Sequence, residues 1–420
     1  MAAPALLIAL AIVAPSVMAL SVTPPAQRSA ALEHARLALL RVGEPSGAAF
    51  GAQNAPVTLI EASATADGAI LKTLPLPGVT AFAASATGGG GATLSPNAES
   101  TSISFVGLTA PPRAVSARAL GPVDGVVVSV DFETGAAKRL LVARGSITAA
   151  SGAPLTAAPG PEGGSYMSFA NAGGPLSWFP GESGEHTDPI AFGLADCSFL
   201  APRVLDGPSQ LVFWASGRGC GGGVGLMATN KPQPQSATAY ALHAGAFKGP
   251  YADASSSSDT KPLGWTVVMS AQSVGAPQSK LKKQKGGKSS DGFRTNSAAL
   301  TVYVSDASVK YGGLWRFAFD GGAFTSGAKP WCKPQGGIAS LTTVGDALVW
   351  LDTAGTRVWK ASASDDACEP KELLALSLAN TNASYTSVSF VLPSGKWPTD
   401  AEKATADALL DAFIEDDTEL

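Results

Sequence analysis

The chain has 420 residues, of which 45% are hydrophobic and 15% are charged, and its formal net charge at pH 7 is −4. This hydrophobic content can bury a sizeable core, which excludes a wholly disordered chain. The small negative charge argues against a general nucleic-acid-binding protein, which would carry a basic face over the whole domain. The 47 glycines and 30 prolines are typical of many short strands joined by tight turns.

The chain begins with a segment typical of a cleaved signal peptide, residues 1–19. Residues 6–13 form a short apolar core between Pro4 and Pro15, and residues 17–19 offer a cleavage site of small or apolar residues. No later stretch reaches the roughly 20 apolar residues that a membrane helix needs. The first residues contain no Lys or Arg, so an uncleaved anchor or a buried segment stays the alternative. We expect a protein of the secretory pathway or the extracellular space, with no membrane span after cleavage.

From residue 37 onward the sequence predicts β-strands separated by turns. Asp67-Gly68 lies between two apolar runs and is a strong hairpin signal. The predicted strands of this first part cover residues 37–42, 57–60, 70–76, 102–108 and 126–132. A further pair of runs, residues 166–169 and 176–179, flanks a glycine pair in the same way.

The second half repeats a recognisable unit. A strand ending at Asp306 is followed by a glycine-rich loop and a second strand that contains Trp315. A second copy has a strand ending at Asp352, a turn, and a strand that contains Trp359. The two aspartates are 46 positions apart and the two tryptophans are 44 apart, which matches one propeller blade of about 40–50 residues.

These units predict an all-β fold, a β-propeller over residues 37–398. Strands starting near residues 102, 165, 210, 264, 300, 347 and 387 would begin seven blades, and the N-terminal strands of residues 37–76 would complete the last one. A four-stranded blade cannot bury both faces alone, so it must stack on neighbours, and closing the ring removes exposed edges. The spacing is irregular, which leaves six or eight blades open, with a pair of β-sandwiches as the main alternative.

Two segments depart from the strand pattern, and a third carries a modification motif. Residues 280–294 are rich in lysine and read as a flexible surface loop. Residues 399–420 begin with a capping-box pattern and continue at helical spacing, which predicts a short acidic amphipathic helix. Asn382 begins the N-x-S triplet Asn382-Ala383-Ser384, the predicted glycosylation site in a eukaryotic host.

The cysteine count suggests two disulfide bonds. An even number of cysteines in an exported chain is typical of a disulfide framework, and four cysteines allow three pairings. We favour Cys197–Cys220 and Cys332–Cys368 because these close the shortest loops. Four free buried thiols are the alternative.

No catalytic, metal or nucleotide motif is present, so no catalytic residue is assigned and the cofactor stays unknown. The three histidines, His34, His186 and His243, form no H-E-x-x-H pair, and no G-x-S-x-G elbow occurs. Residues 217–222 match G-x-G-x-x-G, but Pro232 and further glycines follow where a dinucleotide fold needs a helix.

Asp306 and Asp352 are the candidate ligand or metal residues. They hold equivalent places at strand ends in adjacent units, where a propeller can place carboxylates at one mouth of its central channel to bind Ca²⁺ or a sugar. We favour the alternative that both begin turns by accepting hydrogen bonds from the local backbone, because aspartate is an ordinary turn residue.

Several short segments carry a resemblance to known proteins. Those between Leu39 and Asp131 are residues 40–43, 55–61, 67–68, 74–77, 94–97 and 104–107. This part resembles a group of uncharacterised secreted propeller-like proteins, and the resemblance implies the fold and export but no activity. Residues 303–306 (YVSD) and 349–352 (VWLD) resemble lactonase-type and NHL-type propellers, whose acidic and polar metal ligands are not found here as a full set.

The sequence therefore leaves two functions open. The first is a secreted, non-enzymatic binding or interaction module for an extracellular glycan or protein. The second is a metal-dependent propeller hydrolase of the lactonase type, with Asp306 and Asp352 near its centre. Fold alone does not decide between them, and neither involves nucleic acid.

Overall fold

The structure is a computed structural model of the chain. It describes residues 36–44, 51–64, 69–83, 92–97, 101–116, 123–132, 134–141, 156–159, 164–168, 176–179, 190–191, 199–204, 211–217, 223–229, 240–241, 247–248, 262–270, 299–306, 312–319, 324–326, 329–344, 347–363, 367–376 and 382–391. These residues form β-strands and the turns between them. In this part of the chain, no helix is long and apolar enough to span a membrane.

The described strands form five sheets, and all their pairs are antiparallel except β16 with β20. The largest sheet has the order β25 (Ala383–Val391), β1 (Arg36–Gly43), β2 (Ala55–Ser63), β3 (Ile70–Ala81), β5 (Ser102–Leu108), β6 (Gly125–Asp131) and β7 (Ala137–Leu141), and β4 (Ser95–Pro96) pairs with β5. The second has the order β11 (Ile190–Ala191), β10 (Leu176–Phe179), β9 (Ser165–Ser168) and β8 (Thr156–Pro159). The third has the order β12 (Phe199–Val204), β13 (Leu211–Gly217), β14 (Gly223–Thr229) and β15 (Tyr240–Ala241).

Two sheets come from the second half of the chain. One has the order β16 (Phe247–Lys248), β20 (Phe324–Ser326), β19 (Gly313–Phe319), β18 (Ala299–Asp306) and β17 (Pro262–Ser270). The other has the order β21 (Ser340–Val344), β22 (Ala347–Leu351), β23 (Arg357–Ser362) and β24 (Lys371–Ala375). The strands near residues 264 and 300, which were expected to begin separate blades, are therefore hydrogen-bonded neighbours in one sheet.

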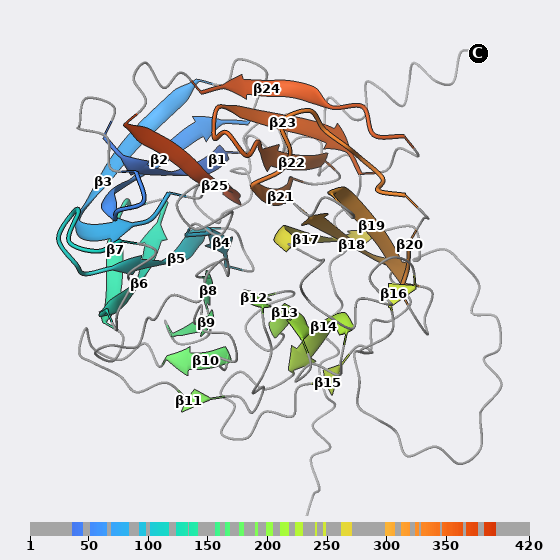
Figure 1. The fold of residues 1–420 in the computed structure, drawn as a ribbon, viewed down its shortest axis with the longest axis horizontal. Coiled ribbons are helices and arrows are strands. Elements are labelled where there is room, and N and C mark those ends of the chain that lie inside the picture. The colour runs from blue at the N-terminus through green and yellow to red at the C-terminus, as the bar shows by residue number, and fades with distance from the viewer. Residues whose placement is uncertain are drawn as a thin grey trace, which may run out of the picture.

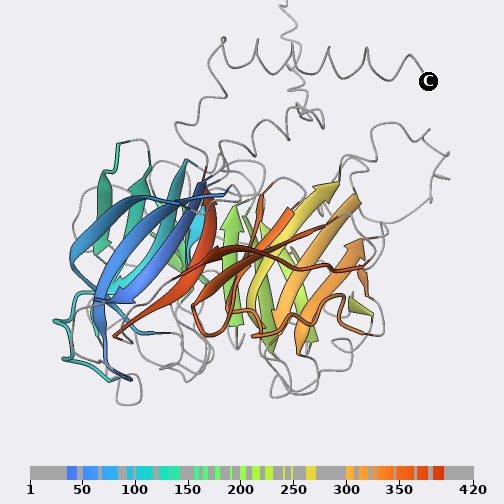
Figure 2. The same cartoon turned by 90° about the horizontal axis from the view of Figure 1, so that it is seen from above.

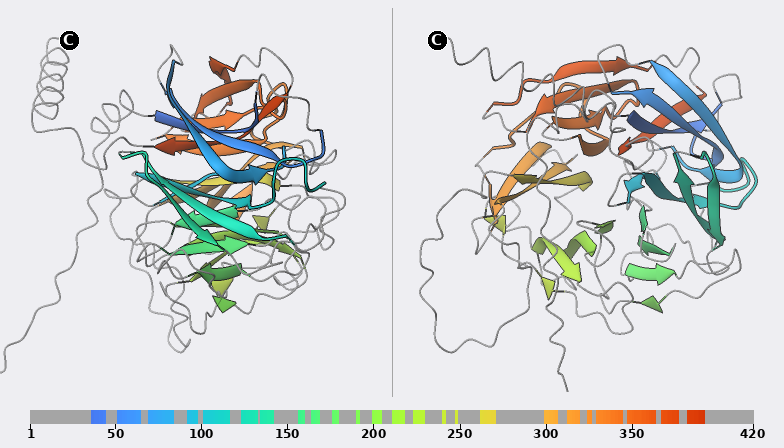
Figure 3. Two further views of the ribbon diagram at one scale, coloured as in Figure 1. Left: turned by 90° about the vertical axis from the view of Figure 1, so that its left-hand side faces the viewer. Right: turned by 180° about the vertical axis from the view of Figure 1, so that it is seen from behind.

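The sheets stand around a common centre, the arrangement of a β-propeller (Figure 1 and Figure 3). Strands β17, β21, β25, β4, β8 and β12 contact one another in this order, and each contact joins two sheets except that of β25 with β4, which lies within the largest sheet. Seen from above, the strands of the different sheets share one layer (Figure 2). The two sandwiches considered as an alternative would instead pack as stacked pairs of sheets.

Strand β1 is apolar on both faces because it lies between two clusters of buried side chains. Leu37 and Leu39 pack on one side into a cluster with Val349, Leu351 and Val358 of the β21–β24 sheet. On the other side, Ala38, Leu40 and Val42 join a cluster with Phe105 and Val128. Successive side chains of a strand point to opposite faces of the sheet. A strand whose two faces both pack on neighbouring sheets therefore needs apolar residues at nearly every position, and the sequence of β1 has this near-continuous apolar pattern.

The last described strand lies beside the first. Strand β25 pairs with β1, with Leu37 opposite Phe390 and Leu39 opposite Val388. The Ser387 hydroxyl accepts a hydrogen bond from the Leu94 backbone N–H at 2.9 Å. The two ends of the described chain are thus joined in one sheet, and this pairing leaves neither strand with an unpaired edge on that side.

Several predicted features fall outside the described residues. They are the signal peptide at 1–19, the lysine-rich segment at 280–294, the helix at 399–420, Cys197, Cys220 and the three histidines. They stay predictions.

Alkaline pH is expected to destabilise this core. Burial raises the pKa of the tyrosines Tyr166, Tyr303 and Tyr385 above the ordinary value near 10. Above about pH 10 the unfolded chain therefore loses phenol protons that the folded chain keeps, so the free energy of unfolding falls as pH rises and is unaffected by these groups at lower pH.

Urea unfolding between about pH 8 and pH 11 measures this effect. We expect a constant midpoint up to about pH 9 and a decline above pH 10 that is shallower in Tyr385→Phe, which lacks one ionising group. A midpoint that stays constant to pH 11 would contradict the expectation.

Candidate functional site

A cavity of about 310 Å³ opens where the β17–β20 sheet meets the β21–β24 sheet. It is bordered by the end of β18, the start of β19, the loop 333–338 that leads into β21, and the turn after β22. Lining residues include Asp306, Gly313, Lys333, Gly337, Ile338 and Thr353. Three separate loops thus contribute to one concave site, the usual design of a ligand pocket.

Asp306 is the acidic side chain of the cavity. It is the last residue of β18, stands opposite Gly313 in the strand register, and is only 4% exposed. It has interactions within the protein, and the two oxygens of a carboxylate can accept about four hydrogen bonds in total. A nearly buried carboxylate is normally paired within the protein, and Asp306 combines such an interaction with a place on the border of the cavity.

Backbone geometry at Gly313 keeps the cavity wall close to β19. Its φ is +122°, a region that favours glycine, and a Cβ there would lie 2.7 Å from the Cys332 carbonyl oxygen. Leu314 and Cys332 exchange two backbone hydrogen bonds of 2.7 and 3.1 Å. The same virtual Cβ is 3.2 Å from Cγ of Lys333, so the lysine stem lies over Gly313, the residue paired with Asp306.

A disulfide bond restrains the loop that forms this wall. Cys332 and Cys368 are bonded, with their Cα atoms 5.3 Å apart, and they are 36 positions apart in sequence. The predicted pairing of these two cysteines is confirmed. Because Cys332 precedes Lys333, the bond ties the loop that carries the lysine to the connection between β23 and β24.

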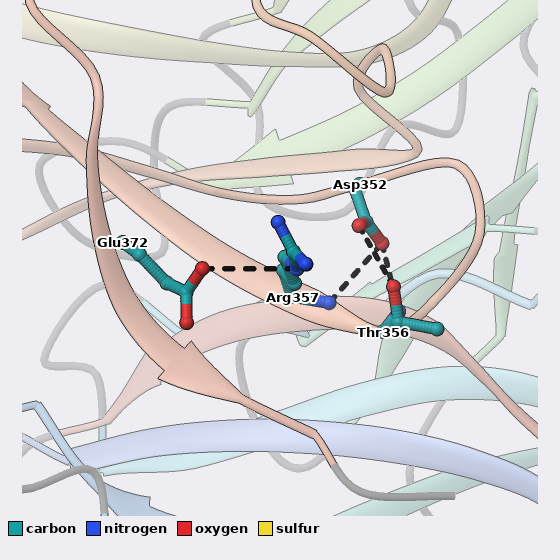
Figure 4. A network of polar contacts seen from close by, with 4 residues as sticks. All are labelled: Asp352, Thr356, Arg357 and Glu372. Atoms are coloured by element: carbon teal, nitrogen blue, oxygen red, sulfur yellow. Dashed lines mark hydrogen bonds and ion pairs between the residues drawn. The ribbon is translucent and has the colours of Figure 1, made fainter.

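Asp352, in contrast, holds its own turn (Figure 4). Its Oδ1 accepts hydrogen bonds from the backbone N–H groups of Thr356 at 2.7 Å and Arg357 at 3.2 Å, and its Oδ2 accepts one from the Thr356 hydroxyl at 3.0 Å. The Arg357 guanidinium also lies 3.7 Å from Glu372. These contacts are those of the turn-forming interpretation, and Asp352 is not among the residues that line the cavity.

The turn after β22 nevertheless braces the cavity loop. The Thr353 backbone N–H donates to the Gly336 carbonyl oxygen at 3.1 Å. A Cβ built on Gly336 would lie 3.6 Å from Cβ of Asp352, and one built on Gly337 would lie 3.0 Å from Cγ2 of Thr353. Asp306 and Asp352 therefore both lie near the loop 333–338. Asp306 borders the cavity with this loop, and Asp352 lies in the turn that contacts Gly336.

Replacing Asp352 tests its structural role. Asp352→Ala removes three hydrogen bonds of a 5%-exposed carboxylate and should lower the free energy of unfolding by about 2 kcal/mol. Asp352→Asn keeps an oxygen for the two backbone donors and should cost about half as much. Urea unfolding of both variants measures the difference in the free energy of unfolding. Equal losses would mean that the hydrogen bonds from the two backbone N–H groups do not account for the stabilisation by Asp352.

Sequence reasoning singled out Asp306 but missed Lys333, Gly337, Ile338 and Thr353. The available signal was the run Lys333-Pro334-Gln335-Gly336-Gly337 directly after a cysteine, which predicts a tight loop but not what the loop faces. Among the described residues, no group of three or more His, Cys, Asp or Glu side chains could hold a metal ion.

The predicted glycosylation triplet lies at the start of β25. Asn382 directly precedes the strand, and Ser384 lies within it, paired with Val42 of β1. The acceptor asparagine is thus at the strand end and its serine inside the sheet. Whether the triplet is used stays a prediction.

Comparisons with known proteins give no functional assignment. No protein-family model matches the sequence, and no curated protein matches it. Among solved structures, a nidogen/laminin complex aligns with a TM-score of 0.43 at 9% identity over 85% of this chain and 98% of that chain. A candidate 6-phosphogluconolactonase from Bacteroides fragilis aligns with the same TM-score and coverage at 13% identity. A protein of unknown function from Desulfotomaculum acetoxidans aligns with a TM-score of 0.37 at 10% identity, over 84% of this chain and 89% of that chain.

Proposed function

We propose that this protein is a non-enzymatic binding module, and that the cavity beside Asp306 receives part of an extracellular glycan or protein. The observation that carries the proposal is a concave site in which a 4%-exposed carboxylate borders open space. Its volume of about 310 Å³ is at the lower end of the roughly 300–1,000 Å³ of small-molecule sites. It therefore suits one group of a larger ligand.

A disulfide bond and backbone hydrogen bonds restrain the cavity wall. The Cys332–Cys368 bond, the paired hydrogen bonds between Cys332 and Leu314, and the Thr353–Gly336 hydrogen bond all restrain the loop 333–338. A site whose loops are already ordered loses less conformational entropy when it binds. This rigidity supports a recognition role.

No specific observation favours the alternative, a metal-dependent hydrolase. A Ca²⁺ ion takes six to eight oxygen ligands, and among the described residues that line the cavity, Asp306 alone has a carboxylate. Asp352 directs its oxygens to its own turn. The hydrolase thus stays a prediction of the sequence, testable by the effect of divalent ions on thermal stability.

We further propose a six-bladed ring in an exported protein. The largest sheet divides naturally between β3 and β5, which are joined by the single pair Thr80 and Leu108, and each other sheet would supply one blade. The disulfide supports an oxidising compartment, which agrees with the predicted signal peptide. An experimental density map viewed along the ring axis, and N-terminal sequencing of the secreted protein, test these two points.

Filling the cavity tests the binding role. Thr353→Trp places an indole at a lining residue, whereas Ala354→Trp changes the exposed neighbour that does not line the cavity. We expect the wild type and Ala354→Trp to retain the same ligands on glycan and peptide arrays, and Thr353→Trp to lose them. Ligands that both variants retain equally would overturn the assignment of this cavity.

A further inference from the structure

We infer that the outer edge of strand β3 is protected against pairing with a strand of a second copy of this chain, and that Pro75 and Pro77 are the residues that protect it. The inference goes beyond the proposed function, and it involves no residue that lines the cavity beside Asp306. The observations behind it are the unpaired edge of β3, the exposed apolar side chains on that strand, and the residues that interrupt the edge.

Strand β3 is at the outside of its sheet (Figure 1). One of its edges pairs with β2 along most of its length. The opposite edge meets another strand at a single pair, Thr80 with Leu108 of β5. In the part of the chain that the structure describes, residues 70–79 therefore present this edge with no strand beside it. Such an edge offers backbone N–H and C=O groups on which another strand can form.

The same part of β3 has exposed apolar side chains. Among the described residues, the exposed large apolar side chains are Ile70 at 55% and Leu71 at 48%. An apolar, exposed edge strand is a predicted site of self-association. A second copy of this chain supplies the same run of residues 70–74 and can satisfy the edge in a symmetric pair, so we take a second copy as the partner that the edge would bind.

Pro75 removes a hydrogen-bond donor from the outer edge. It is opposite Thr58 of β2, but a proline has no backbone N–H. In an antiparallel ladder, opposed residues alternate between pairs that exchange two hydrogen bonds and pairs that exchange none. The pair of Pro75 with Thr58 must be of the second kind, so the backbone of Pro75 faces the outer edge. Thr73, two positions earlier in the same register, faces the same way and keeps its N–H.

Two further features interrupt this edge. Pro77 also lacks an N–H, so over residues 73–77 Thr73 alone can donate a backbone hydrogen bond outward. Leu71 is an extra residue in the ladder, because the register with β2 shifts between Ile70 and Lys72. A bulge of this kind bends an edge strand and twists it away from a regular partner. The stretch that a second strand could pair with is therefore short.

The charge of Lys72 opposes the most favourable self-pairing. This side chain is exposed and is the central residue of the run 70–74. An antiparallel pair of two copies centred on that run would place one Lys72 directly opposite the other, and like charges in that position are destabilising. Prolines, lysines and bulges are the means by which natural edge strands avoid pairing, and β3 has all three.

The double variant Pro75→Thr/Pro77→Thr tests the inference, since it restores two backbone N–H groups with a residue that favours strands. In sedimentation at micromolar to millimolar concentration, we expect it to reach about twice the mass of the wild type. Adding Lys72→Thr should lower its dissociation constant about threefold. A double variant that sediments as the wild type does over the whole range would overturn the inference.

The matched control is Pro111→Thr/Pro112→Thr. These two prolines are also exposed, but they lie in the loop after β5 and not on a strand edge. The control should sediment as the wild type does. If it associates as strongly as the double variant of β3, the loss of proline itself and not the opened edge causes association, and the inference is wrong.

Hydrogen exchange locates the contact. The outward amide of Thr73 should exchange at least tenfold more slowly when the double variant associates. The amide of Leu39, in a strand paired on both sides, should exchange equally slowly in both proteins and so report that the variant is folded. Pro75→Thr alone restores one donor and gives the same test if the double variant does not fold. Association that leaves the exchange of Thr73 unchanged would assign the contact to another surface and overturn the inference.

Discussion

Loss of the Cys332–Cys368 bond is expected to lower the free energy of unfolding by about 4 kcal/mol. The bond closes a loop across 36 positions, and the chain-entropy model gives about this value for a loop of that length. The loop contains β21, β22 and β23. In the unfolded chain the bond therefore lowers the conformational entropy of the segment that forms these three strands.

The double variant Cys332→Ala/Cys368→Ala measures this contribution, since it leaves no unpaired thiol from the bond. Urea unfolding is compared with that of the wild type under oxidising and reducing conditions. The double variant should be insensitive to reductant at this site, and each single variant should cost about as much as the double one. A loss below about 1 kcal/mol would mean that the bond adds little beyond the contacts around it.

Replacing Gly355 by alanine is expected to cost about 4 kcal/mol, because a conformational penalty of about 1–2 kcal/mol combines with an overpacking penalty of about 1–3 kcal/mol. Its φ is +67°, which costs a residue with a Cβ about 1–2 kcal/mol. A Cβ would also lie 2.5 Å from the backbone oxygen and 3.1 Å from the backbone nitrogen of Tyr385. Tyr385 belongs to β25, paired with Arg41 of β1, so the clash would push on the strand that joins the two ends of the chain.

Gly51→Ala is the matched control. This glycine also has a positive φ, +54°, but a Cβ there would meet no atom within 4 Å. It should cost only the conformational penalty of about 1–2 kcal/mol, and the difference between the two variants in urea unfolding isolates the steric contact. Equal losses would show that β25 moves aside at no cost, which would contradict close packing at this junction.

The strands were largely predictable because they lie between two neighbours. Residues 102–108 were predicted as a strand and form β5, and the run 126–132 is one position away from β6. In both, buried apolar residues at nearly every position reflect packing on two faces. The pairing of Cys332 with Cys368 was predictable from loop length alone.

The grouping of strands was harder to predict. Strands β17 and β18 are separated by a long segment that contains the lysine-rich stretch, so their starts are almost as far apart in sequence as two true repeats. Hydrogen bonding nevertheless puts them side by side in one sheet. Sequence spacing counts residues in loops and strands alike, and long loops cost little free energy to close.

The site was only half predictable for a related reason. Asp306 and Asp352 have the same place in the repeat. A tight-turn sequence with Gly355 follows Asp352, and a longer segment follows Asp306, but this difference does not predict which aspartate borders a cavity. The difference arises from the loop 333–338, which borders a cavity with Asp306 and packs against the turn of Asp352. Such a difference depends on tertiary contacts between segments that are distant in the chain.

The most direct test of the central claim, that the cavity beside Asp306 is a ligand site, is an NMR titration of protein with labelled isoleucine methyl groups. Ile338 lines the cavity, whereas Ile103 is buried in a different cluster. Adding each sugar or peptide retained by the arrays should shift the Ile338 methyl signal and leave that of Ile103 in place. A ligand that binds while the Ile338 signal stays unmoved would contradict the claim.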